Sequence, residues 1–283
     1  MKNVAGSGGK WLDVSAERFP GWIASFSVRH GLSGPDRAWQ ASVAAGAEGS
    51  PAGPACALSV TFGDDHASFA AEDGSVAECY PPFPPPGGAA VLAAAVEAGP
   101  DSATNSASPA APTSPAEVAA IAEAFAAHAR RPRTVGVLLV RLGGYAAGVF
   151  AGYPPALQDA KVGSRLVHGR SAAGGWSQHR FARRREKQAN EALDAAADAA
   201  VLIFTRGGMG GKKETGGKTA AGLDAVVLGG DRRAVAELRD DPRLAPYFAL
   251  AAERFLTVPD PKRAVLLETP RLFTAVRIRL TET

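Results

Sequence analysis

Residues 161–200 read KVGSRLVHGRSAAGGWSQHRFARRREKQANEALDAAADAA, and three different elements follow one another within them. Residues 161–168 have the pattern of a strand, and residues 169–177 are small and flexible. A helix is predicted from Gln178 onward, rich first in arginine and then in alanine. We therefore expect a glycine-rich loop that brings one polar side chain, Gln178, to the head of a cationic helix.

Positive charge is concentrated in this segment. Residues 161–190 hold eight Lys or Arg and one acid, a net charge of +7, whereas the whole chain carries +3. Residues 1–130 hold six basic and thirteen acidic residues, a net charge of −7. Cations gathered on one element are typical of a site for a polyanion. The candidate phosphate-binding residues are Arg165, Arg170, Arg180, Arg183, Arg184 and Lys187.

The spacing within the predicted helix separates two faces. Residues three and four apart share a face, which groups Arg180, Arg183, Arg184 and Lys187. The other side is expected to pack on a sheet, through Phe181, Ala192, Leu193, Ala196 and Ala200.

Strands surround this segment. TVGVLLVRL (134–142) and YAAGVFAGY (145–153) predict a hairpin turned by Gly143 and Gly144. LDAVVL (223–228) predicts a further strand, followed by a helix from Arg232. Strands that alternate with helices over 117–283 predict an α/β domain with a mixed central sheet.

The first part of the chain differs in composition. A helix over 11–30 and three short strands between 55 and 80 predict a small α+β module at 1–80. Residues 81–116 are rich in Pro, Ser and Ala, with few bulky apolar side chains, and predict a linker. Ser114 and Glu117 form a capping-box pattern at the start of the next helix.

Several classes of protein lack support in the sequence. No apolar run is long enough to span a membrane, and residues 1–11 lack the apolar core of a signal peptide. Cys56 and Cys79 are the only cysteines, which favours a cytoplasmic protein and no zinc site. GGKT at 216–219 lacks the first glycine of a P-loop, since position 212 is Lys. We expect no metal and no organic cofactor.

A loop glutamine suits one kind of chemistry. Gln cannot act as a general base, but its side-chain carbonyl can hold a water molecule and its backbone N–H can donate to an oxyanion. Those two functions suffice for a bond that is already activated, such as the ester between a peptide and the 3′ ribose of tRNA. Glycines beside Gln178 would let the loop enter a crowded RNA cavity.

Five segments occur in an order that resembles the bacterial branch of the Vms-like release-factor family. GGWSQHRFARRR also resembles the GGQ loop and following helix of eukaryotic and archaeal class I peptide release factors. The segments are GVLLVRLGGYAAGVF (136–150), KVGSRLVHGR (161–170), GGWSQHRFARRR (174–185), LDAVVLGGDRRAV (223–235) and LAPYFALAAERFLTVPDP (244–261).

The resemblance implies a GGQ-domain-like, RNase H-like catalytic domain that hydrolyses peptidyl-tRNA on stalled large ribosomal subunits, in ribosome rescue and quality control. It implies the large subunit and peptidyl-tRNA as partners, with no DNA and no membrane. The implied catalytic residues are Gln178 with Gly174, Gly175 and Ser177 of the loop. Class I factors have Gly-Gly-Gln contiguous, whereas Trp176 and Ser177 intervene here, and Trp176 either stacks on a base or anchors the loop.

Two other functions stay open at this point. The basic helix would also suit a non-catalytic module that binds RNA or the ribosome. A nuclease acting near the tRNA 3′ end would need clustered carboxylates for metal ions, and Asp159, Asp224 and Asp231 lie near predicted strand ends.

Overall fold

The computed structural model of the chain describes residues 9–30, 58–92, 113–141, 143–164, 177–208 and 222–283. The contacts divide it into two compact units. The first unit consists of residues 1–130 and 274–283, and the second unit consists of residues 131–273. The chain therefore leaves the first unit, builds the second, and returns to the first for its last strand.

The first unit contains a five-stranded antiparallel sheet. In spatial order the strands are β1 (Lys10–Val14), β10 (Val276–Thr281), β4 (Val76–Tyr80), β3 (Ala67–Ala70) and β2 (Ser59–Phe62). The C-terminal strand of the chain, β10, lies inside this sheet, between β1 and β4.

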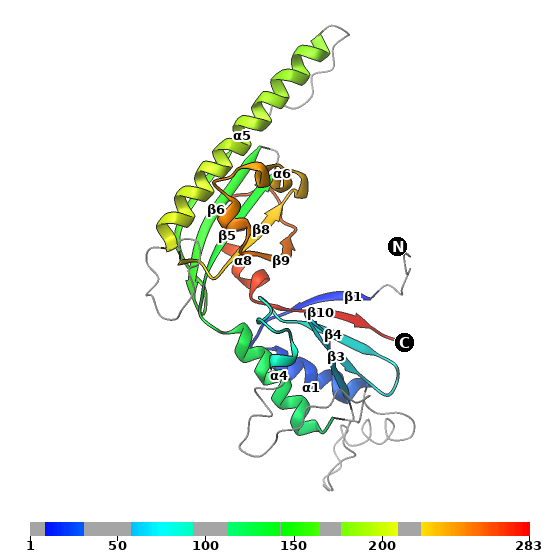
Figure 1. Cartoon of the computed structure of the whole chain (residues 1–283). Helices are drawn as coiled ribbons and strands as arrows, with labels where there is room; N and C mark the ends of the chain where they lie inside the picture. Colours follow the sequence, from blue (N-terminus) through cyan, green and yellow to red (C-terminus); the bar gives the residue numbers. More distant parts are fainter. Residues whose placement is uncertain (1–8, 31–57, 93–112, 142, 165–176, 209–221) are drawn as a thin grey trace. The chain divides into compact units, whose positions relative to one another are not determined.

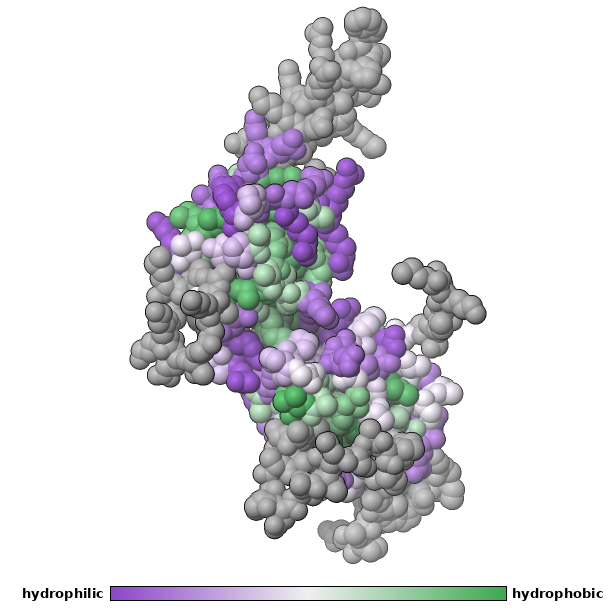
Figure 2. Space-filling view, in the orientation of Figure 1, coloured by the Kyte–Doolittle hydropathy of each residue, from purple (hydrophilic) through white to green (hydrophobic). Residues whose placement is uncertain are grey.

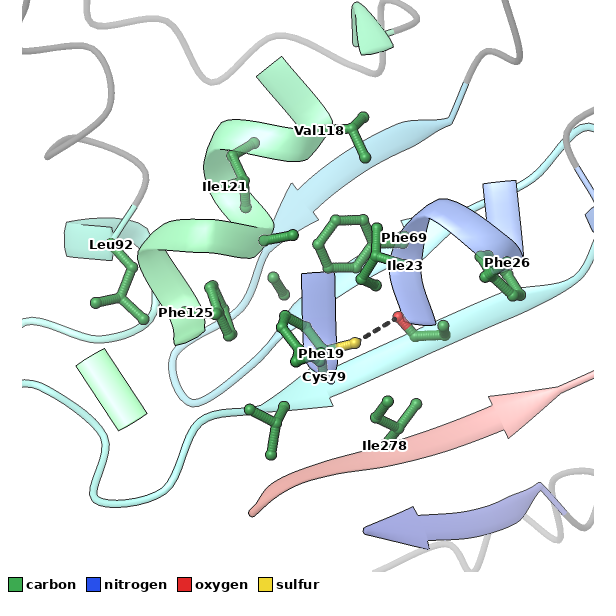
Figure 3. Close-up of a cluster of buried hydrophobic side chains, with 14 of the residues drawn as sticks. Phe19, Ile23, Phe26, Phe69, Cys79, Leu92, Val118, Ile121, Phe125 and Ile278 are labelled. Atoms are coloured by element: carbon green, nitrogen blue, oxygen red, sulfur yellow. Dashed lines mark hydrogen bonds between the residues drawn. The ribbon is translucent and has the colours of Figure 1, made fainter. Parts of the chain in front are cut away.

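Two helices, α1 (Phe19–His30) and α4 (Pro115–Ala129), close the core of this unit. The rings of Phe19 and Phe125 stack with centroids 5.9 Å apart, and Phe69 of β3 is fully buried with them (Figure 3). The predicted capping box is confirmed, because Ser114 accepts from the Glu117 N–H and the Glu117 carboxylate accepts from the Ser114 N–H.

The second unit contains the predicted mixed sheet, so the α/β class is confirmed. Three strands form an antiparallel meander, and two further strands continue the sheet parallel to the first of them. Gly143, at the hairpin, has φ +99°, a conformation that favours glycine. In spatial order the strands are β7 (Ala156–Ser164), β6 (Gly144–Gly152), β5 (Arg133–Arg141), β8 (Ala225–Gly230) and β9 (Ala251–Leu256).

Helices cover both faces of the second sheet (Figure 1). One face packs against α5 (Ser177–Gly208), α6 (Arg232–Glu237), the 3-10 turn Leu238–Asp240 and α7 (Ala245–Phe248). Successive residues of a strand point to opposite faces, so Phe150 lies on the face opposite Val149. Phe150 meets Phe273 of α8 (Arg263–Phe273) edge to face, with ring centroids 5.9 Å apart. The sheet is thus the middle layer of three.

The boundaries of the two units differ from the predicted ones. α4 was expected to open the second domain, but its buried residues, including Ile121 and Phe125, belong to the first core. The predicted linker is partly folded, since Ala89 and Leu92 are buried in that core. β10 was also assigned to the second domain, yet it pairs with β1 and β4. The second unit accordingly spans 131–273 rather than 117–283.

The structure contains one strand and one helix that the sequence did not predict. The helix expected over 11–30 begins at Phe19, and residues 10–14 form β1. α8 was not predicted, because Pro270 lies inside it and lacks the N–H that would donate to the Leu266 carbonyl one turn earlier. The hydroxyl of Thr269 donates to that carbonyl instead, at 2.7 Å, and both residues are fully buried.

We predict that Thr269→Val destabilises the second unit by about 1–3 kcal/mol, because the buried Leu266 carbonyl loses its donor. Thr269→Ser keeps the hydroxyl and should retain most of the stability. The free energy of unfolding in urea measures both variants. A Val variant as stable as the wild type would show that the hydroxyl bond is not needed.

We predict that residues 131–273 fold alone, whereas residues 1–130 do not, because β1 then loses its neighbour and Ile278 leaves the core. Joining residues 274–283 to 1–130 through a Gly/Ser linker should restore a cooperative thermal transition. Circular dichroism of the three fragments tests this. Cooperative melting of 1–130 alone would contradict the interleaved division.

Candidate functional site

The structure places the predicted catalytic glutamine at the start of a long helix. Ser177 is the first residue of α5, one residue before the predicted start at Gln178, and Gln178 lies in the first turn. For residues 177–189 only the helical backbone is described. It brings the predicted cations of this helix, Arg180, Arg183, Arg184 and Lys187, into its first three turns. Arg165, Arg170, Gly174, Gly175 and Trp176 lie outside the described residues.

The second half of α5 is anchored on the sheet. Ala196 and Ala200 are fully buried, as predicted, and Leu193 packs against the same core. Phe204 meets Tyr247 edge to face at 5.2 Å between centroids. The hydroxyls of Thr205 and Tyr247 form a hydrogen bond of 3.0 Å, which joins α5 to α7.

Small residues let this half of the helix approach the strands closely. A Cβ built on Gly207 would lie 2.6 Å from the side chain of Val149 in β6. A Cβ on Gly136 of β5 would lie 3.0 Å from the ring of Phe204. These contacts also set the direction of α5, because its last turns lie near the beginning of β5.

A charged network holds the exposed side of the same half. Arg243 donates to Asp198 of α5 at 2.7 Å and to Asp241 at 2.7 Å. Hydrogen bonds from Arg243 lower the pKa of Asp241 below its ordinary value. The guanidinium therefore joins α5 to the segment that precedes α7.

The first half of α5 projects past the end of the sheet (Figure 1). A helix of 32 residues is about 48 Å long, whereas a strand of nine residues, such as β5, spans about 30 Å. The difference leaves about 18 Å of helix beyond the sheet. The structure thus carries Gln178 at the far tip of a helix whose other end is packed in the core.

Charge changes sign along α5. Residues 177–190 carry five Lys or Arg and one Glu, whereas residues 191–208 carry three acids and one Arg. The first turn contains no acid. Cations near a helix N-terminus oppose the helix dipole, an effect of about 0.3–1 kcal/mol per exposed charge. The cations therefore do not help the helix to form, and they suit contact with a polyanion.

The carboxylates considered for a metal-dependent nuclease do not converge. The Asp224 carboxylate accepts from the Thr134 N–H at the beginning of β5. The Asp231 N–H donates to the Val140 carbonyl near the end of β5, and Asp231 caps α6. Six residues of strand separate these two positions, about 20 Å. Asp159 lies on β7, beyond β6.

The described residues contain neither a metal-binding cluster nor a membrane-spanning helix. No group of three or more His, Cys, Asp or Glu in that part of the chain is arranged to hold a metal ion. No described helix is both long and apolar enough to cross a membrane.

Comparison with known families identifies the class. The model of the family described as Actinobacteria/chloroflexi VLRF1 release factor matches residues 133–279, which is more than half of the 283 residues. This match covers nearly the whole second unit, including α5 with the candidate glutamine in its first turn, and it extends into β10. The second unit is therefore a release-factor domain, as the resemblance implied. The chain belongs to the Actinobacteria/chloroflexi VLRF1 release factor family.

Comparison with solved structures gives a more distant likeness. The crystal structure of archaeal translation termination factor aRF1 is similar to 50% of this chain and to 36% of that chain. The sequences are 11% identical over the match, and the TM-score is 0.30. The chain thus spans about a third of that factor. No curated protein matches the sequence.

Proposed function

We propose that this chain is a peptidyl-tRNA hydrolase that releases nascent peptides from tRNA on stalled large ribosomal subunits. The observation that carries the proposal is the position of Gln178. It lies in the first turn of α5, inside the region that matches the release-factor family. An anchored, projecting helix is suited to carrying a polar group into a cavity that the body of the domain does not enter.

The reaction adds water to the ester that joins the peptide to the 3′ ribose of tRNA. The Gln178 side-chain oxygen accepts a hydrogen bond from the water and orients it toward the carbonyl carbon. Water forms the new C–O bond, the bond to the ribose oxygen breaks, and a proton passes from the water to that oxygen. The products are a free peptide carboxyl group and an intact 3′ hydroxyl.

The helix backbone can assist this step. The first four N–H groups of an α-helix have no acceptor within the helix. Gln178 lies in that turn of α5, so its N–H can donate to the oxyanion of the tetrahedral intermediate. The proposal assigns Gly174, Gly175 and Ser177 to the catalytic site together with Gln178. No step draws on a metal or an organic cofactor.

The cations around the glutamine would hold the RNA. Guanidinium groups bind phosphate through paired, charge-assisted hydrogen bonds. In this proposal the cations of α5 lie along the phosphates that surround the ester, and Trp176 is a further RNA contact. The remaining proposed contacts come from Arg165 and Arg170. A protein with these partners would act in the cytoplasm, in ribosome rescue.

We predict that Gln178→Ala slows peptide release, because the activation free energy of the chemical step rises by about 2–4 kcal/mol, the range for losing one preorganised polar group. Gln188→Ala, ten residues further along the same helix, is the matched control and should release at the wild-type rate. Single-turnover release of a labelled peptide from isolated large subunits measures both. Equal rates for the two variants would exclude Gln178 as the catalytic residue.

We predict that reversing Arg183 and Arg184 to Glu weakens binding to the large subunit. Each lost phosphate contact should flatten the log–log salt dependence of affinity by roughly 0.7–0.9. Reversing Lys212 and Lys213 changes net charge equally and is expected to matter less. Sedimentation binding assays over a range of salt compare the two. An unchanged affinity and slope for the Arg183/Arg184 variant would show that this part of α5 does not contact RNA.

A further inference from the structure

The second sheet has a basic edge that the sequence analysis did not identify. β8 and β9 run parallel to β5, so the C-terminal ends of these three strands lie at one edge of the sheet. Five cations end one of these strands, or lie at the start of the helix that follows one. They are Arg141, Arg232, Arg233, Lys262 and Arg263, and we call them the basic edge.

The side chains of two members of the basic edge, Arg141 and Arg232, contact residues in or just after β9. Arg141 ends β5 and donates through Nη1 to the carbonyl of Val258, which follows β9, at 3.0 Å. The guanidinium carbon of Arg232, just after β8, lies 4.4 Å from the ring centroid of Phe255 in β9. The ends of all three parallel strands are therefore tied to one another.

The helix α8 begins at the same edge. Pro261 lies beside Gly144 at the start of β6, since a Cβ on Gly144 would be 3.8 Å from the Pro261 carbonyl oxygen. Gly144 pairs with Arg141 across the hairpin. Lys262 and Arg263 follow Pro261 directly, and both are exposed.

Most of the charge at this edge is not neutralised within the protein. Arg233 pairs with Glu237 at 3.3 Å. Among the described residues, none of Arg232, Lys262 and Arg263 has a carboxylate within ion-pair distance, and all three are exposed. Figure 2 shows hydrophilic residues gathered over this part of the second unit, near α6.

The projecting half of α5 leaves the sheet at the basic edge. Ser164, the last residue of β7, pairs with Gly144, so the chain departs toward the candidate loop from this edge. α5 then returns along the sheet, and Phe204 reaches Gly136 near the opposite edge. The basic edge therefore forms the base from which the cationic helix extends.

We infer that the basic edge contacts ribosomal RNA of the large subunit, at the rim of the cavity that α5 enters. The inference rests on the proposed function. Residues 177–189 of the helix span about 20 Å, so a helix that inserts its tip to reach an ester brings its base against the rim. Arg232, Lys262 and Arg263 are exposed and have no carboxylate partner among the described residues, so their charges are suited to phosphates at that rim.

The test compares two double reversals in the full-length chain. One is Arg232→Glu with Arg263→Glu at the basic edge. The matched control is Arg131→Glu with Arg206→Glu, two exposed cations at the opposite edge, with the same change of net charge. Affinity for purified vacant large subunits is measured over a range of salt. A third variant, Arg232→Lys with Arg263→Lys, retains the charge.

The basic-edge reversal should weaken binding at least tenfold and flatten the log–log salt slope by roughly 1.4–1.8, the value for two phosphate contacts. The opposite-edge control should bind nearly as the wild type does, and the Lys variant should recover most of the affinity. Thermal melting checks that all variants are folded.

Three results would overturn the inference, and each leads to a separate conclusion. Wild-type affinity in the folded basic-edge variant would show that this edge does not contact RNA. A defect seen only on subunits that carry peptidyl-tRNA would assign the contact to tRNA instead. Failure of the wild-type protein to bind large subunits at all would remove the proposed function itself.

Discussion

The close packing of the second half of α5 on β5 and β6 is the interaction on which the rest of the second unit depends. Glycine at 136 and 207 and alanine at 196 and 200 remove the side-chain bulk that would hold the helix away from the strands. The helix axis is thereby fixed over the sheet. Its first half can extend past the sheet without a core of its own, because the anchored half supports it. The same packing therefore decides where Gln178 stands relative to the body of the domain.

The distribution of charge follows from this arrangement. The anchored half of α5 carries three acids and one Arg, and one of those acids, Asp198, pairs with Arg243. Cations are gathered on the projecting half of α5 and at the basic edge beneath it, while residues 1–130 carry a net charge of −7. Folding gains nothing from placing like charges together at a helix N-terminus. A polyanionic partner that meets the tip and base of α5 together accounts for both groups of cations.

The sequence predicted those elements that are determined by residues close together in the chain. The α4 cap follows from Ser114 and Glu117, and the β5–β6 hairpin follows from two apolar runs around Gly143. β1 and β10 escaped prediction in their true places because each is held by a partner more than 250 residues away. α8 was missed because Pro270 usually ends a helix, and the compensating Thr269 hydroxyl is visible only in three dimensions. The sequence predicted the helix of the candidate site, whereas the basic edge arises only when parallel pairing joins segments far apart in the chain.

The central claim is that this release-factor family member hydrolyses the ester of peptidyl-tRNA with a water held at the tip of α5. The measurement that tests it most directly is the mass of the tRNA 3′ end after the protein has released a peptide from isolated large subunits. Hydrolysis of the ester leaves a complete CCA end with a free 3′ hydroxyl, which is the result the account predicts. A tRNA shortened at its 3′ end, with nucleotides still attached to the released peptide, would show nuclease action and contradict it.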